Sequence, residues 1–170
     1  MVELKVQDYF KNKQTYAEKE KLLLSALGNN TEINHVGSTA IPDMCGKNII
    51  DVLVGAKNQE EFERFKEIIV WLGYFASQNS KTEIYQFFAS RQGETGEGDS
   101  HIHLVVMDTE RYNDFLILRD YLLANKKEAE DYSNHKKKLI EMGVVDRKEY
   151  RRVKSEYVSA LIERARKFAK

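Results

Sequence analysis

The residues best suited to chemistry in this chain are a Gly-Ser step and an acid that follows it. Gly37 and Ser38 come directly after the extended segment 32–36 and form a tight turn. Such a turn presents backbone N–H groups and a hydroxyl at the end of a strand, which is a common way to hold a phosphate. Asp51 lies inside an apolar run at 49–54, where an unpaired carboxylate is costly, so we expect a cation or hydrogen-bond donors beside it. The alternatives are a plain turn and a buried aspartate that caps a loop.

Two histidines have the spacing of a second functional group. His101 and His103 are two residues apart on an expected strand, so their imidazoles point to the same face and could ligate one ion. Histidine favours Zn²⁺, Mn²⁺ or Ni²⁺ over Mg²⁺. The alternative is that both are hydrogen-bonded to neighbours, or that one binds substrate. His35 could likewise be a metal ligand, or hydrogen-bond to neighbours or bind substrate. Its position close to Gly37 suggests that it faces the same cleft as the turn.

Several cations are candidates for binding phosphate. Lys47 lies four residues before Asp51 and could neutralise a phosphate or pair with the acid. Arg119 could reach a phosphate with a bidentate fork, or it could join with Asp120 to link the helical tail to the sheet. Lys136 and Lys154 each follow a tyrosine by four residues, and we expect both on helix surfaces.

Strands and helices must position these side chains. Apolar spacing predicts helices at 8–27, 58–72, 111–124, 127–142 and 147–168, and strands at 32–36, 48–54, 83–89 and 101–107. Pro42 limits 39–46 to a short helical turn, and the polar stretch 91–100 is typical of a hairpin tip. The pattern predicts an α+β fold, a mixed sheet flanked by helices that lie on one side, followed by a helical C-terminal part. The sheet core covers about 31–108 and the C-terminal helices about 110–168, all within a single domain, 1–170.

Composition narrows the range of partners and compartments. The net charge is zero, but residues 126–170 hold 14 Lys or Arg against 8 Asp or Glu, which suggests an acidic part and a basic lid, or merely solvated helix faces. The single Cys45 and the lack of a leader pattern predict a cytoplasmic protein. No apolar run approaches the roughly 20 residues of a membrane span, and no aromatic-basic motif favours nucleic acid.

Three blocks of sequence resemble a known family. HVGSTAIP (35–42) with IID (49–51), HIH (101–103), and RDYL (119–122) with KSEY (154–157) are similar to the GrpB family of predicted nucleotidyltransferases. A Gly-Ser turn followed by an acid on the next strand also resembles the nucleotidyltransferase signature of the DNA polymerase β superfamily. The resemblance implies transfer of a nucleotidyl group from an NTP to a small acceptor with a divalent metal ion, Mg²⁺ or Mn²⁺, or Zn²⁺ if histidines bind it.

The resemblance also implies roles for individual residues. Asp51 would be catalytic, and Gly37, Ser38, Lys47 and Arg119 would bind the nucleotide. The metal ligands would be Asp51, His101 and His103.

Two positions depart from the family pattern. The second carboxylate of the transferase dyad would stand two residues after Asp51, where this chain has Leu53, and the proline that usually follows the lysine is replaced by Asn48. Leu53 puts two-metal chemistry in doubt. The alternative function is a non-catalytic module with a degenerate metal site that binds a nucleotide or a coenzyme A-like ligand. GrpB-like domains also occur fused to dephospho-coenzyme A kinases, which is consistent with such a ligand.

Overall fold

A mixed β-sheet forms the centre of the computed structural model, which describes residues 4–90, 98–144 and 146–168. Within these residues the sheet has five strands in the order β2-β4-β7-β6-β5. The strands are β2 (Glu32–Val36), β4 (Ile50–Ala56), β5 (Phe75–Thr82), β6 (Tyr85–Ala89) and β7 (Ser100–Val106). β4 and β7 run parallel, and the other neighbours are antiparallel. A separate pair joins β1 (Lys5–Val6) to β3 (Cys45–Gly46).

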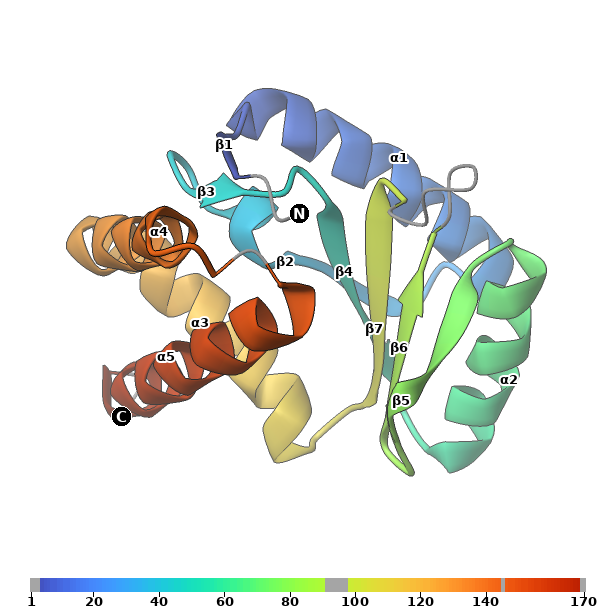
Figure 1. Ribbon diagram of the computed structural model, residues 1–170. Coiled ribbons are helices and arrows are strands. Elements are labelled where there is room, and N and C mark those ends of the chain that lie inside the picture. Colours follow the sequence, from blue (N-terminus) through green and yellow to red (C-terminus); the bar gives the residue numbers. More distant parts are fainter. Residues whose placement is uncertain (1–3, 91–97, 145, 169–170) are drawn as a thin grey trace.

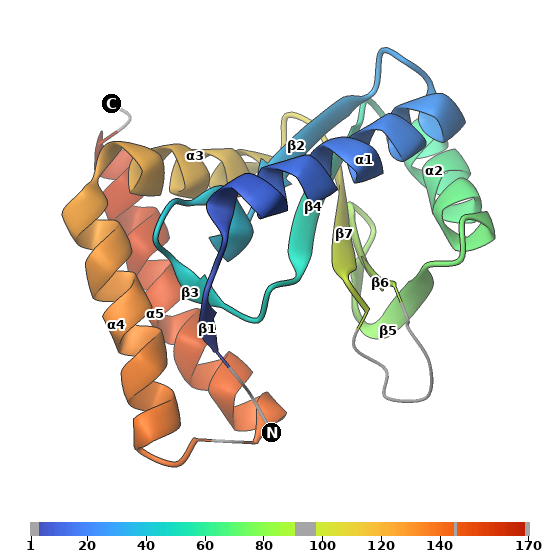
Figure 2. The same ribbon diagram turned by 90° about the horizontal axis from the view of Figure 1, so that it is seen from above.

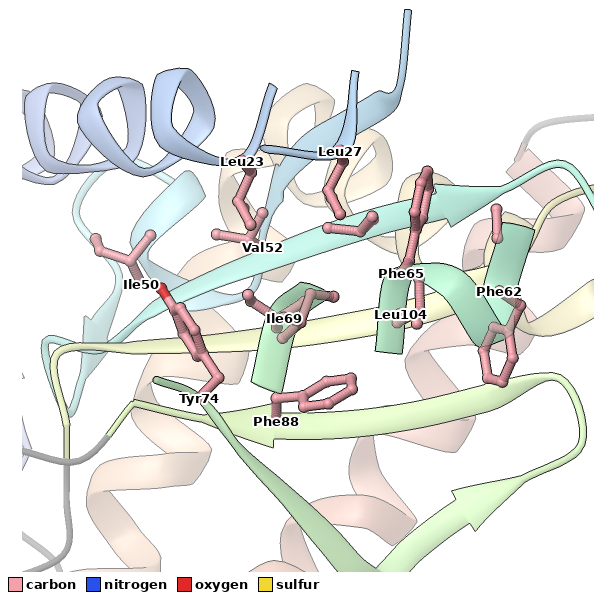
Figure 3. Close-up of a cluster of buried hydrophobic side chains, with 13 residues drawn as sticks. Leu23, Leu27, Ile50, Val52, Phe62, Phe65, Ile69, Tyr74, Phe88 and Leu104 are labelled. Atoms are coloured by element: carbon pink, nitrogen blue, oxygen red, sulfur yellow. The ribbon is translucent and has the colours of Figure 1, made fainter. Parts of the chain in front are cut away.

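One face of the sheet packs against two helices, α1 (Tyr9–Leu27) and α2 (Gln59–Trp71). Their N-termini are capped by the side chains of Asp8 and Asn58. Even-numbered residues of β4 point to this face because side chains alternate along a strand. They meet Leu23 and Leu27 of α1 together with the aromatic and aliphatic stripe of α2, and Figure 3 shows this core.

The opposite face is covered by the C-terminal helices, as Figure 1 shows. These are α3 (Glu110–Ala124), α4 (Lys126–Glu141) and α5 (Arg147–Phe168). Leu53 on this face packs with Tyr112 of α3, and Leu161 of α5 packs with Tyr121 of α3. The expectation that helices lie on one side is therefore wrong. Val52 and Leu53 point in opposite directions and both are 0% exposed, so both faces need cover.

The predicted elements correspond closely to the observed ones. The strand at 32–36 and the helix at 147–168 have their predicted ends, and the ends of the other helices lie within one residue of prediction. The hairpin of β6 and β7 is confirmed, although 91–97 of its expected tip lie outside the described residues. β1, β3 and β5 were not predicted. Among the helices that the structure describes, none is long and apolar enough to span a membrane.

Candidate functional site

A cavity of 690 Å³ is lined by residues of the Asp51 face of the sheet and of the C-terminal helices. Figure 2 shows these parts of the fold from above. This volume is within the range of small-molecule sites. Among the described residues that line it, Asp51 is the one carboxylate. Six lining residues are cations: Lys47, Arg111, Arg119, Lys136, Arg151 and Lys154. The cavity is therefore suited to an anionic ligand.

The Gly37–Ser38 turn is in contact with Asp51. Val36 pairs with Asp51 in the β2–β4 ladder, and the chain then turns into the short helix η1 (Ser38–Ala40). Gly37 has φ 72° and ψ −169°, a conformation almost confined to glycine. A Cβ at this position would lie 2.3 Å from Asp51 Oδ2. The predicted proximity of turn and acid is therefore present, and it depends on glycine.

Asp51 is bonded to both strand histidines. The parallel register of β4 and β7 places His101 beside Asp51, and His101 Nδ1 donates to Asp51 Oδ1 at 3.1 Å. His103 Nε2 lies 3.5 Å from the same oxygen. Burial by itself raises the pKa of Asp51, but hydrogen bonds from the two imidazoles outweigh it and hold that pKa below its usual range. The carboxylate is therefore ionised and acts as an acceptor.

Tyr85 extends this group, although the sequence interpretation missed it. Its hydroxyl lies 3.1 Å from His103 Nδ1. The Tyr85 hydroxyl and the His103 imidazole thus form a hydrogen bond. The guanidinium of Arg111 lies 3.7 Å from the centroid of the Tyr85 ring. Strand alternation could have found Tyr85, since β6 pairs with β7 and its odd-numbered residues share the histidine face.

Lys136 is a buried residue of the site and not the surface lysine that we expected. It is 2% exposed, and its Nζ donates to Ser38 Oγ at 2.8 Å and to the carbonyl of Cys45. Burial lowers the pKa of Lys136 to about 8. The helical stripe of Ala129, Tyr132 and Leu139 is buried, and position 136 lies on the same stripe. This helical spacing could have predicted from the sequence that Lys136 is buried.

Lys154, from α5, reaches the same cavity. Burial lowers its pKa, Asp51 opposes this effect, and Lys47 and Arg151 lower the pKa further. Lys47 itself lines the cavity with its Nζ 5.9 Å from the centroid of the Tyr150 ring. Lysines that are remote in sequence therefore face a common space.

The loop after Lys47 turns at Asn48, where the resemblance implies a proline. Asn48 has φ 60°, which proline cannot adopt. With its amide oriented to satisfy both partners, Gln7 accepts from the Asn48 N–H at 3.0 Å and donates to the Ser38 carbonyl at 3.2 Å. With asparagine at position 48, Gln7 of the N-terminal segment can hydrogen-bond both to this loop and to the Ser38 turn.

Arg119 lines the cavity and also fastens α3 to the sheet. Its Nη1 donates to Asn34 Oδ1 at 3.1 Å and to the His35 carbonyl at 3.4 Å, and its Nε donates to Asp120 Oδ1 at 2.7 Å. The linking role that we considered is therefore present. The role of Arg119 in binding phosphate stays a prediction.

His35 faces away from the cavity, so the expectation that it shares the cleft is wrong. Its Nε2 lies 2.9 Å from Thr39 Oγ1, and its ring stacks on Tyr16 of α1 at 4.5 Å. Adjacent residues of a strand point to opposite faces, and Val36 takes the face of Asp51. Burial lowers the pKa of His35 to about 4.

The residues present do not fit a two-metal site. Leu53, where the second carboxylate would stand, is 0% exposed and packs with Val36, Tyr85 and Val105. In the described ranges, no group of three or more His, Cys, Asp or Glu side chains is arranged to hold a metal ion. The structure does bring Asp51, His101 and His103 together, and their role as metal ligands stays a prediction.

Comparison with solved structures finds proteins of similar fold. A structure of Cid1, described by its RNA terminal uridylyl transferase activity, has a TM-score of 0.53 and 15% identity, over 78% of this chain and 40% of Cid1. At this identity the likeness concerns the fold alone. The conserved protein GrpB from Enterococcus faecalis has a TM-score of 0.83 and 22% identity, over 99% of this chain and 100% of that chain.

A family model described as GrpB protein matches residues 3–164, and the chain belongs to this family. A UPF0157 protein of Pseudomonas aeruginosa is 33% identical over 88% of this chain and 60% of its own length. The glutamate-rich protein GrpB of Alkalihalophilus pseudofirmus is 29% identical over 88% of each chain.

Proposed function

We propose that the cavity binds a nucleoside triphosphate and that the protein transfers its nucleotidyl group to a small acceptor. One observation carries the proposal. The Gly37–Ser38 turn, the ionised Asp51 and six cationic side chains all border a single cavity. The nucleotidyltransferase-like fold supports the same function at the level of architecture.

The proposed roles follow from the positions of the side chains. Ser38, Lys47 and Arg119, which line the cavity, contact the phosphates. The acceptor oxygen attacks the α-phosphorus, a new phosphorus–oxygen bond forms, and the bond to pyrophosphate breaks. His101 receives the acceptor's proton at Nε2, because its Nδ1 proton is held by Asp51.

Label transfer tests this function directly. The protein is incubated with α-³²P-labelled NTPs, divalent ions and a small-molecule extract of cells as the source of acceptor. We expect labelled product together with released pyrophosphate, and loss of at least ~100-fold in Asp51→Asn. Asp43→Asn, an exposed acid whose positive φ asparagine tolerates, is the matched control and should retain activity. Equal activity in the two variants would contradict the proposed role of Asp51.

A second candidate is a non-catalytic module for a nucleotide or a coenzyme A-like ligand. The burial of Leu53 favours it, because a fully apolar residue occupies the position of the second carboxylate. This function predicts tight binding of such a ligand with no release of pyrophosphate from any NTP.

A further inference from the structure

Two lysines of the C-terminal helices line the cavity beside the Ser38 turn. Lys136 comes from α4 and Lys154 from α5. Lys136 is almost fully buried, and its two hydrogen-bond acceptors, a hydroxyl and a backbone carbonyl, are both neutral. A buried cation that does not face a carboxylate directly is costly for the free protein. Such a residue is favourable where a ligand supplies the negative charge.

Further positive charge surrounds these lysines. Lys154 depresses the pKa of Lys136, and Lys47 and Arg151 depress that of Lys154. The carboxylate that acts on both lysines is Asp51, which already accepts a hydrogen bond from His101. Four cations from three segments of the chain therefore line one cavity, and Lys154 interacts with each of the other three. Their combined field attracts polyanions.

The Ser38 hydroxyl connects this cluster to the turn. Its oxygen accepts from Lys136 Nζ, so its own hydrogen is available to another acceptor. Ser38 lines the cavity. A phosphate oxygen placed there would receive this hydrogen and lie next to the lysine charges.

We propose that Lys136 and Lys154, with Lys47 and Arg151, form a subsite for a diphosphate or triphosphate group and bind it without a divalent ion. The inference deepens the proposed function. It rests on the proposed function only in assuming that the ligand carries a nucleoside. The binding of the phosphate groups does not depend on that function. A single phosphate can contact one or two of these cations, whereas a phosphate chain can span the cluster, so affinity should rise with chain length.

Calorimetric titration with inorganic anions tests the subsite. Orthophosphate, pyrophosphate and tripolyphosphate are titrated into the full chain in EDTA. We expect at least a ~10-fold fall in Kd from orthophosphate to pyrophosphate, and a further fall to tripolyphosphate. Lys136→Met and Lys154→Met should each weaken pyrophosphate binding at least ~10-fold. The controls are Lys137→Met and Lys167→Met, exposed lysines of the same two helices, which should stay within ~2-fold.

Melting curves accompany each titration, because Lys136→Met removes the donor to Ser38 and Cys45. If that variant does not fold, Lys154→Met carries the test. Equal affinity for the three anions, binding that needs Mg²⁺, or equal weakening in the control variants would overturn the inference. Binding of pyrophosphate without binding of any nucleotide would remove the proposed function and leave the subsite. If nucleotide binds only with Mg²⁺ and pyrophosphate does not bind in EDTA, the subsite is wrong and the proposed function remains.

Discussion

Gly37 packs so closely against Asp51 that a Cβ atom at position 37 would clash with the carboxylate. Replacing Gly37 by alanine puts a Cβ 2.3 Å from a carboxylate oxygen and strains a backbone conformation that is almost confined to glycine. Gly143→Ala is the matched control, because Gly143 has φ 80° and nothing within 4 Å of the added Cβ. We expect Gly37→Ala to lower the free energy of unfolding by about 1–3 kcal/mol more than the control does. Urea denaturation measures both, and equal losses would show that the contact with Asp51 is unimportant.

Lys136 should make stability depend on pH in the alkaline range. Its pKa is about 8 in the folded protein, against an ordinary value of 10.5, so between these values the unfolded chain binds more protons than the folded one. Stability contributed at this residue therefore rises with pH. From pH 8 to 9.5 the free energy of unfolding should gain on the order of 1–2 kcal/mol.

The measurement is urea denaturation at the two pH values, for the wild type and for Lys136→Met. The gain should be absent in Lys136→Met and present in Lys137→Met. If the free energy of unfolding rises equally in all three proteins, titratable groups other than Lys136 cause the rise.

At the scale of elements, α5 is held over the cavity by its apolar stripe. Leu161 is 0% exposed and packs in the cluster that joins α3, α4 and α5. Leu161→Ala should lower the free energy of unfolding by about 2–5 kcal/mol and increase hydrogen exchange in α5 more than in α2. Leu123→Ala, at a leucine of α3 that is 46% exposed, should cost about 1 kcal/mol or less. If exchange rises equally in α2 and α5, α5 does not open independently.

Elements with a strong apolar pattern could be predicted from the sequence. Elements that form only because they pair with a neighbouring strand could not. The apolar runs of β4 and β7 indicated buried strands, and their alternation correctly grouped His101 with His103. β5 (Phe75–Thr82) is polar and largely exposed, and it is a strand because it pairs with β6 at the edge of the sheet. Alternation along β2, and not nearness to Gly37 in the sequence, decides the face on which His35 lies.

At the scale of the whole molecule, the uneven charge of the sequence has a structural counterpart. The basic C-terminal part places Lys136, Arg151 and Lys154 on the cavity, opposite the sheet that carries Asp51. The sequence indicated the excess of charge but not the burial of Lys136, which depends on the packing of α4 against the β3 loop through Ser133 and Cys45. The division of the chain into a single domain stays a prediction.

The cavity should bind a nucleoside phosphate. A thermal-shift titration with the four NTPs and coenzyme A, each with and without Mg²⁺, measures this binding. At about 100 times its Kd, a ligand that binds only the folded state adds roughly 2.7 kcal/mol, which raises Tm by roughly 5–11 °C for a chain of this size. We predict such a rise with at least one NTP, and its loss in Ser38→Ala combined with Asp51→Asn. No shift with any of these ligands, or an equal shift in the double variant, would show that this cavity does not bind a nucleoside phosphate through Ser38 and Asp51.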